Sequence, residues 1–208
     1  MKLKNLTLSI VAIAVAFGFS SCGYNSMVAK NQDVASKWSQ VESQYQRRTD
    51  LYNSVVKTIQ GSAQFEQNTL KEVIEARSRA TSIQVDASKL TPESIAAFQQ
   101  AQNQLAGAFG RLIAVAEQYP DLKTTQAFRD FQTQIEGTEN RINKSRDDFN
   151  ASVQDYNTYI KTFPNNLFAG LFHFTEKGYF KANAGTENPP DINFNTNPTL
   201  PPAGATQQ

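Results

Sequence analysis

The chain has 208 residues, and its 20 Lys and Arg against 19 Asp and Glu give a formal net charge of +1. The length suffices for one domain with a sizeable core, and the balanced charge argues against a nucleic-acid partner. One Cys and one His exclude an internal disulfide framework and argue against a zinc site. The sequence contains no glycine-rich phosphate loop, no G-x-S-x-G and no H-E-x-x-H. We therefore expect no catalytic set, no cofactor and no metal.

The first 21 residues have the pattern of a secretory signal peptide. Lys2 and Lys4 provide a positive start, residues 6–19 are mostly apolar and uncharged, and small residues precede Cys22. A helix across the ~30 Å hydrocarbon core of a bilayer needs roughly 20 apolar residues, so this run is too short to span it.

The only Cys of the chain stands where such a signal is cut. Residues 19–23, Phe-Ser-Ser-Cys-Gly, resemble a bacterial lipobox, although Phe19 stands where Leu is commonest. We expect Cys22 to carry the lipid, since two or more acyl chains anchor a protein stably. The alternative is an ordinary signal peptide with a chance Cys nearby. Gly23 and the absence of a following acidic run resemble the sorting pattern that favours the outer over the inner membrane, with the chain facing the periplasm.

Apolar positions at alternating steps of three and four predict amphipathic helices along the mature chain. The pattern covers residues 34–59, 95–119 and 128–163, and a weaker helical spacing covers 70–80. Thr91-Pro92-Glu93 is a helix start, with Thr as the N-cap and Pro in the first turn. No segment has the strict alternation of an exposed strand, so the fold class is all-α.

A single helix over 28–83 would be ~80 Å long, and half of its apolar seam would lack a partner. A break at Gln60-Gly61-Ser62 removes this problem, and Gly costs ~1 kcal/mol relative to Ala inside a helix. We therefore predict an antiparallel up-and-down four-helix bundle over residues 22–183. Three helices with a very long first helix are the alternative.

Two segments follow the last predicted helix. Residues 165–180 are apolar and aromatic but too short to span a membrane, and we expect them to form a cap over one end of the bundle. Residues 184–208 contain five of the eight prolines and two charges, which predicts a disordered tail.

Polar residues interrupt the apolar seams. Arg48 lies on the apolar face of 34–59, and on the last helix four polar positions lie within roughly 40° of one another. A charge at a seam position is costly unless it is paired, so we expect a buried polar network between helices. Its expected role is structural, and a ligand site is the alternative. The predicted members are Arg48, Glu66, Arg77, Glu139, Arg146, Asn150 and Asn157.

Many of these positions together resemble the LemA family. The resemblance covers about residues 24–182, and it rests on Trp38-x-x-Val41, Arg48-x-Asp50-Leu51, Glu66, Ala76-Arg77, Glu117-x-Tyr119-Pro120-x-Leu122-Lys123, Phe128, Glu139-x-Arg141-Ile142-x-x-x-Arg146-x-x-Phe149-Asn150-x-x-Val153-x-x-Tyr156-Asn157, Phe163-Pro164 and Tyr179-Phe180. The chain departs from the family at Phe149, where Tyr is usual, and in its lipid anchor, because many relatives have a short membrane segment. The resemblance implies a bromodomain-like four-helix bundle at a membrane, and no enzyme activity.

Two hypotheses follow. The first is a lipid-anchored, non-enzymatic scaffold of the bacterial cell envelope that offers a helical face or its tail to a protein partner. The second is a binder of an anionic small molecule or lipid, in a cavity between helices lined by Arg48, Arg77, Arg146 and the two Asn residues, because arginines fork onto carboxylates and phosphates.

Overall fold

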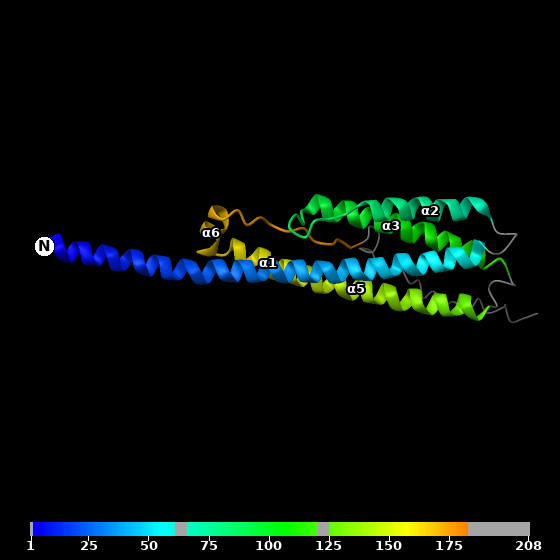
Figure 1. The fold of residues 1–208 in the computed structure, drawn as a ribbon, viewed down its shortest axis with the longest axis horizontal. Helices are drawn as coiled ribbons and strands as arrows, with labels where there is room; N and C mark the ends of the chain where they lie inside the picture. Colours follow the sequence, from blue (N-terminus) through cyan, green and yellow to red (C-terminus); the bar gives the residue numbers. More distant parts are fainter. Residues whose placement is uncertain (1, 61–65, 120–124, 183–208) are drawn as a thin grey trace, which may run out of the picture.

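The computed structural model describes residues 2–60, 66–119 and 125–182, with side chains from Gly23 onward. These residues form five helices and contain no strand, so the prediction of an all-α protein is confirmed. In chain order (Figure 1) the helices are α1 (Lys2–Gln60), α2 (Gln67–Ser82), α3 (Pro92–Ala116), α5 (Gln126–Lys161) and α6 (Asn165–Leu171).

The four long helices run in alternating directions and form a bundle, as predicted (Figure 1). They pack as two close pairs, α1 with α5 and α2 with α3. Aromatic rings link the pairs, and Tyr52 of α1 stacks on Phe109 of α3 with ring centroids 3.6 Å apart. Because α1 ends at Gln60 and α2 is a separate helix, the three-helix alternative is wrong. The predicted hinge at Gly61 lies outside the described residues.

Two helix starts have a threonine side chain as the N-cap. The Thr91 side chain accepts from the backbone N–H of Ser94, and Pro92 occupies the first position of α3, as predicted. The Thr125 side chain accepts from the backbone N–H of Phe128 at the start of α5. Each hydroxyl satisfies a donor that the helix itself leaves unpaired.

The predicted seam of α1 is buried along its whole length, from Val34 to Ile59. The core consists of two apolar clusters, which meet α1 on either side of Arg48. One cluster includes Trp38 and Tyr45, and the other begins at Tyr52. A polar layer at Arg48 therefore separates the two halves of the core.

The chain after α5 differs from the predicted cap. α6 lies beside α1 at the end of the bundle nearest the N-terminus, but the chain then runs back along the bundle toward the start of α3 (Figure 1). Residues 174–182, which we call the strap, form neither helix nor strand, and Phe180 within them is buried. The seam predicted for 128–163 holds as far as Ile160, whereas Phe163 is exposed because α5 has already ended.

In the part of the chain described here, no helix has an apolar run long enough to cross a membrane. The backbone of residues 2–22 belongs to α1. The predicted lipid-bearing side chain of Cys22 and the predicted tail 184–208 lie outside the residues whose side chains are described.

Candidate functional site

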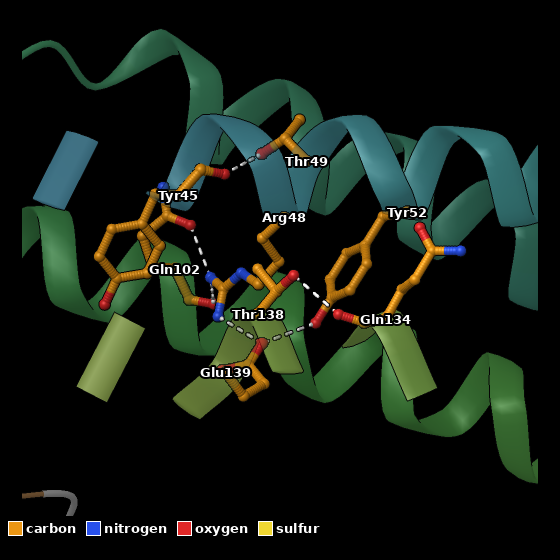
Figure 2. A network of polar contacts seen from close by, with 8 residues as sticks. All are labelled: Tyr45, Arg48, Thr49, Tyr52, Gln102, Gln134, Thr138 and Glu139. Carbon is orange, nitrogen blue, oxygen red and sulfur yellow. Dashed lines mark hydrogen bonds and ion pairs between the residues drawn. The ribbon is translucent and has the colours of Figure 1, made fainter. Parts of the chain in front are cut away.

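Arg48 is the centre of a polar network that joins three helices (Figure 2). Its side chain enters the core from α1, and the residue is only 4% exposed. Nη2 donates to Gln102 on α3, at 2.6 Å from Oε1 and 3.1 Å from the carbonyl oxygen. Nη1 forms an ion pair with Oε1 of Glu139 on α5, at 3.3 Å. One guanidinium thus links the α1–α5 pair of helices to the α2–α3 pair, which explains how a charge is tolerated in an apolar seam.

Two tyrosines enclose this guanidinium. The carbon Cζ of Arg48 lies 4.7 Å from the ring centroid of Tyr45 and 5.7 Å from that of Tyr52. The Tyr52 hydroxyl donates to Oε1 of Glu139 at 3.4 Å, so this oxygen accepts from both residues. Burial is the main cause that raises the pKa of both tyrosines above the ordinary value. The rings therefore remain neutral and shield the charge of Arg48 from water.

Glu66 and Arg77 do not belong to the buried network, so this part of the prediction is wrong. Both residues are exposed. The buried side of α2 follows Thr69, Leu70, Val73, Ala76 and Ala80. Arg77 is one position beyond Ala76, or about 100° around the helix, and its side chain therefore reaches solvent. Glu66 precedes α2, at its N-cap position.

Two other predicted polar residues of α5, together with a glutamine of α3, bind the backbone of the strap. The Asn157 side chain donates to the carbonyl oxygen of Lys177 and accepts from its N–H, both at 2.9 Å. Asn150 makes the same pair of bonds with Phe180, at 3.0 and 2.9 Å. Gln99 on α3 makes it with Lys181, at 2.7 and 3.1 Å. Three side-chain amides thus replace the ladder that a neighbouring strand would provide.

Arg146 and Tyr156 also bind the strap. Nη2 of Arg146 donates to the carbonyl oxygen of Lys181 at 2.9 Å, and its guanidinium lies over the ring of Phe180, 5.0 Å from the centroid. The Tyr156 hydroxyl donates to the carbonyl oxygen of Thr175 at 3.0 Å. Burial raises the pKa of Tyr156 to about 12. Of the polar residues predicted on α5, Glu139 contacts Arg48, whereas Arg146, Asn150 and Asn157 bind the strap.

Phe180 and Gly178 show how closely the strap packs against the helices of the bundle. The ring of Phe180 contacts Trp38 and Phe149, with centroids 6.0 and 5.6 Å away. Gly178 donates its N–H to the carbonyl oxygen of Leu90 at 2.8 Å. A Cβ at Gly178 would lie 2.6 Å from the Cα of Pro92, so only glycine permits this approach.

Sequence reasoning missed the two glutamines of α3 as network members. Gln102 is a polar residue within the apolar seam of 95–119, and a polar residue at such a position indicates a buried hydrogen-bond partner. Gln99 has no such signal, because its partner is a backbone group of an irregular segment. Among the described residues, no group of three His, Cys, Asp or Glu side chains could hold a metal ion.

The described surface has shallow grooves lined by polar and apolar groups. One, of about 860 Å³, lies between α2 and α3. An ion pair between Glu72 and Arg111, with 3.0 Å between Oε2 and Nη2, crosses this groove. Arg79, Gln100 and Gln104 add further hydrogen-bonding groups to its lining. Such a surface suits contact with another polar protein surface more than an enclosed small molecule.

Comparisons with known proteins identify the family of the chain. The sequence profile described as "LemA family" matches residues 37–194. The chain is 25% identical to magnetosome protein MamQ 1 of Paramagnetospirillum magneticum and to magnetosome protein MamQ of Magnetospirillum gryphiswaldense, over 88% of this chain and 74% of each relative. It is also 25% identical to protein LemA of Metamycoplasma hominis, over 76% of this chain and 68% of that protein. With the profile match covering most of its length, the chain belongs to the LemA family.

Proposed function

We propose that this protein is a lipid-anchored, non-enzymatic scaffold of the bacterial cell envelope. The observation that carries the proposal is the arrangement of α1. Cys22 directly follows the predicted signal peptide, and from Cys22 onward the same helix continues into a bundle whose buried polar groups bind one another. The chain thus joins a membrane-directed end to a self-contained helical body.

The anchor is supported by the sequence around Cys22. A positive start, an apolar run too short to span a bilayer and small residues before the Cys are together typical of a lipoprotein signal. Two acyl chains or more would hold the protein stably at the membrane. The residues after Cys22 favour the outer membrane, with the bundle in the periplasm. These features make membrane association the first element of the proposed function.

A scaffold role is supported by the way the polar centres are used. Arg48 is bound by Gln102 and Glu139, and Asn150 and Asn157 are bound by the strap. These groups stabilise the bundle and present no reactive pair to a substrate. The names of the relatives state a cellular structure or a family and no reaction, which also favours a non-enzymatic role.

The anionic-ligand hypothesis requires several arginines in one site. Arg48 is buried against Gln102 and Glu139, Arg77 is exposed on α2, and Arg146 donates to the strap. Each of the three arginines has its own surroundings, so no shared anion site is formed by them. The geometry therefore favours the scaffold over this alternative.

The groove between α2 and α3 is the surface we assign to the protein partner. Its lining includes amide side chains and charged side chains of both signs. The test is cross-linking in intact cells with a photoreactive benzoylphenylalanine at Gln104, an exposed groove residue. A matched control carries the same group at Gln40, which is exposed in a groove between α1 and α5.

The proposal predicts one reproducible protein adduct from Gln104 and from its groove neighbour Gln100, and none of the same mass from Gln40. Both groove positions are expected to capture the same envelope protein. Failure to recover any reproducible adduct from the groove positions would count against a scaffold function.

A further inference from the structure

The outer side of α6 is an unusual surface for this protein. Leu167 is 63% exposed and Leu171 is 68% exposed. The two residues are four apart, so they lie on the same side of the helix. Phe163, which is 75% exposed, and Phe172 extend the surface at either end. We call these four residues the α6 face. Large apolar side chains that gather on a surface mark a contact with something apolar.

The opposite side of α6 fixes its position on the bundle. Ala169 is buried, and Phe168 packs against the core cluster that contains Trp38. Residues 163–174 contain no Asp, Glu, Lys or Arg. The short helix is therefore held by its inner side and is apolar without charges on its outer side.

The α6 face lies beside the point where the chain leaves the membrane-directed segment. A Cβ added to Gly23 would be 3.5 Å from Oδ1 of Asn165, the first residue of α6. The ring of Tyr24, itself partly exposed, lies 4.9 Å from that of Phe172, centroid to centroid. Gly23 directly follows Cys22, and one residue of helix is about 1.5 Å long. An anchor at Cys22 consequently places the α6 face at the surface of the bilayer.

We propose that the α6 face is a second membrane contact, which rests in the interfacial layer of the bilayer that holds Cys22. This inference rests on the proposed membrane anchor. Apolar side chains flanked by aromatic rings are the residues that bind the boundary between headgroups and acyl chains. A protein partner would have to enter between the bundle and the bilayer, whereas the lipid surface is already there. Two contacts, at Cys22 and at α6, then fix the tilt of the bundle.

The test uses the mature full-length protein with a fluorescent probe at Leu167→Cys. Because Cys22 is the only Cys of the chain, the lipidated protein has no other thiol to label. Leu171→Cys is the second position, and Ile74→Cys, an exposed apolar residue on α2, is the matched control. The labelled proteins are reconstituted into vesicles of phosphatidylethanolamine and phosphatidylglycerol. Flotation, quenching by nitroxide-bearing lipids and quenching by aqueous iodide are then measured.

The proposal predicts that all three proteins float and that lipid quenching at residues 167 and 171 exceeds that at residue 74 at least twofold. Iodide is expected to quench the probe at residue 74 more strongly. Proteins that float while residues 167 and 171 behave like residue 74 overturn the second contact and leave the anchor intact. Protection of residue 167 from both quenchers means that protein covers the face, which also overturns it. Proteins that do not float, or that also take label at Cys22, overturn the anchor together with the contact.

Discussion

At the scale of single residues, Arg48 is the contact that joins the two pairs of helices, through Gln102 on α3 and Glu139 on α5. A charge in an apolar seam must have a partner, and this requirement follows from the spacing alone. Glu139 was among the expected partners because it lies on a polar row of α5. The other partner is Gln102, whose Oε1 lies 2.6 Å from Nη2 of Arg48. This pairing depends on how α3 packs against α1, and the sequence pattern of one helix does not predict it.

Replacement of Arg48 tests the network. Arg48→Ala removes the Arg48 donor from the buried Oε1 of Gln102 and opens a cavity, so we expect a loss of about 3 kcal/mol in the free energy of unfolding. The Glu139 side chain is 37% exposed, so water hydrates it in the variant, and the lost ion pair adds little to the loss of stability. Arg48→Lys should recover less than half of this lost free energy, because an ammonium group cannot bind both partners with the geometry of a guanidinium. Urea denaturation measures the change, with the exposed neighbour Arg47→Ala as the control. Equal midpoints for the variants at positions 47 and 48 would show that the network is not stabilising.

Tyr156 makes stability depend on pH in the alkaline range. Burial raises its pKa to about 12 in the folded state, from an ordinary value of 10. The neutral hydroxyl therefore contributes stability that is complete below pH 10 and is lost as the pH rises toward 12. Tyr156→Phe should cost about 1 kcal/mol at pH 8, through the lost bond to the Thr175 carbonyl. Between pH 10 and 12, the free energy of unfolding of Tyr156→Phe should fall less steeply than that of the wild type. Denaturation at each pH compares the two proteins, and parallel curves would contradict the assignment.

At the scale of elements, the helices follow from the sequence and the strap does not. Periodic apolar residues identify a helix and its buried side, and the seams of α1 and α3 are buried as predicted from Val34 to Ile59 and from Ile95 to Ala116. The strap is bound through its backbone by Gln99, Asn150 and Asn157. Backbone contacts leave no periodic pattern in the bound segment, which explains why a simple cap was expected there.

Gly178→Ala tests the fit of the strap. Its Cβ would meet the backbone of Pro92 at 2.6 Å, and neither segment can move freely. We expect a loss of about 1–3 kcal/mol of stability, with faster hydrogen exchange at the amides of Lys177 and Phe180. Gly110→Ala on α3 is the control, because it meets nothing within 4 Å and should stabilise its helix by about 0.5–1 kcal/mol. Unchanged exchange at both amides in Gly178→Ala would mean that the strap is not held by this contact.

At the scale of the whole molecule, the sequence predicts the class of fold but not the placement of its parts. Heptad spacing predicts long helices and a bundle, because each seam needs a partner. The packing as two close pairs, with Arg48 between two core clusters, depends on side-chain sizes on facing helices. The sequence also indicates a membrane-directed start, while the position of α6 beside Gly23 emerges only from the folded chain.

The most direct test of the membrane-anchored account is the intact mass of the mature protein, combined with cell fractionation of the wild type and Cys22→Ala. The account predicts that the wild type begins at Cys22, carries the mass of a lipid and is found with the membranes. It also predicts that Cys22→Ala has no lipid mass and loses this membrane association. A wild-type protein that is cut near Ser21, has no lipid and is recovered in soluble form would contradict the anchor and the function built on it.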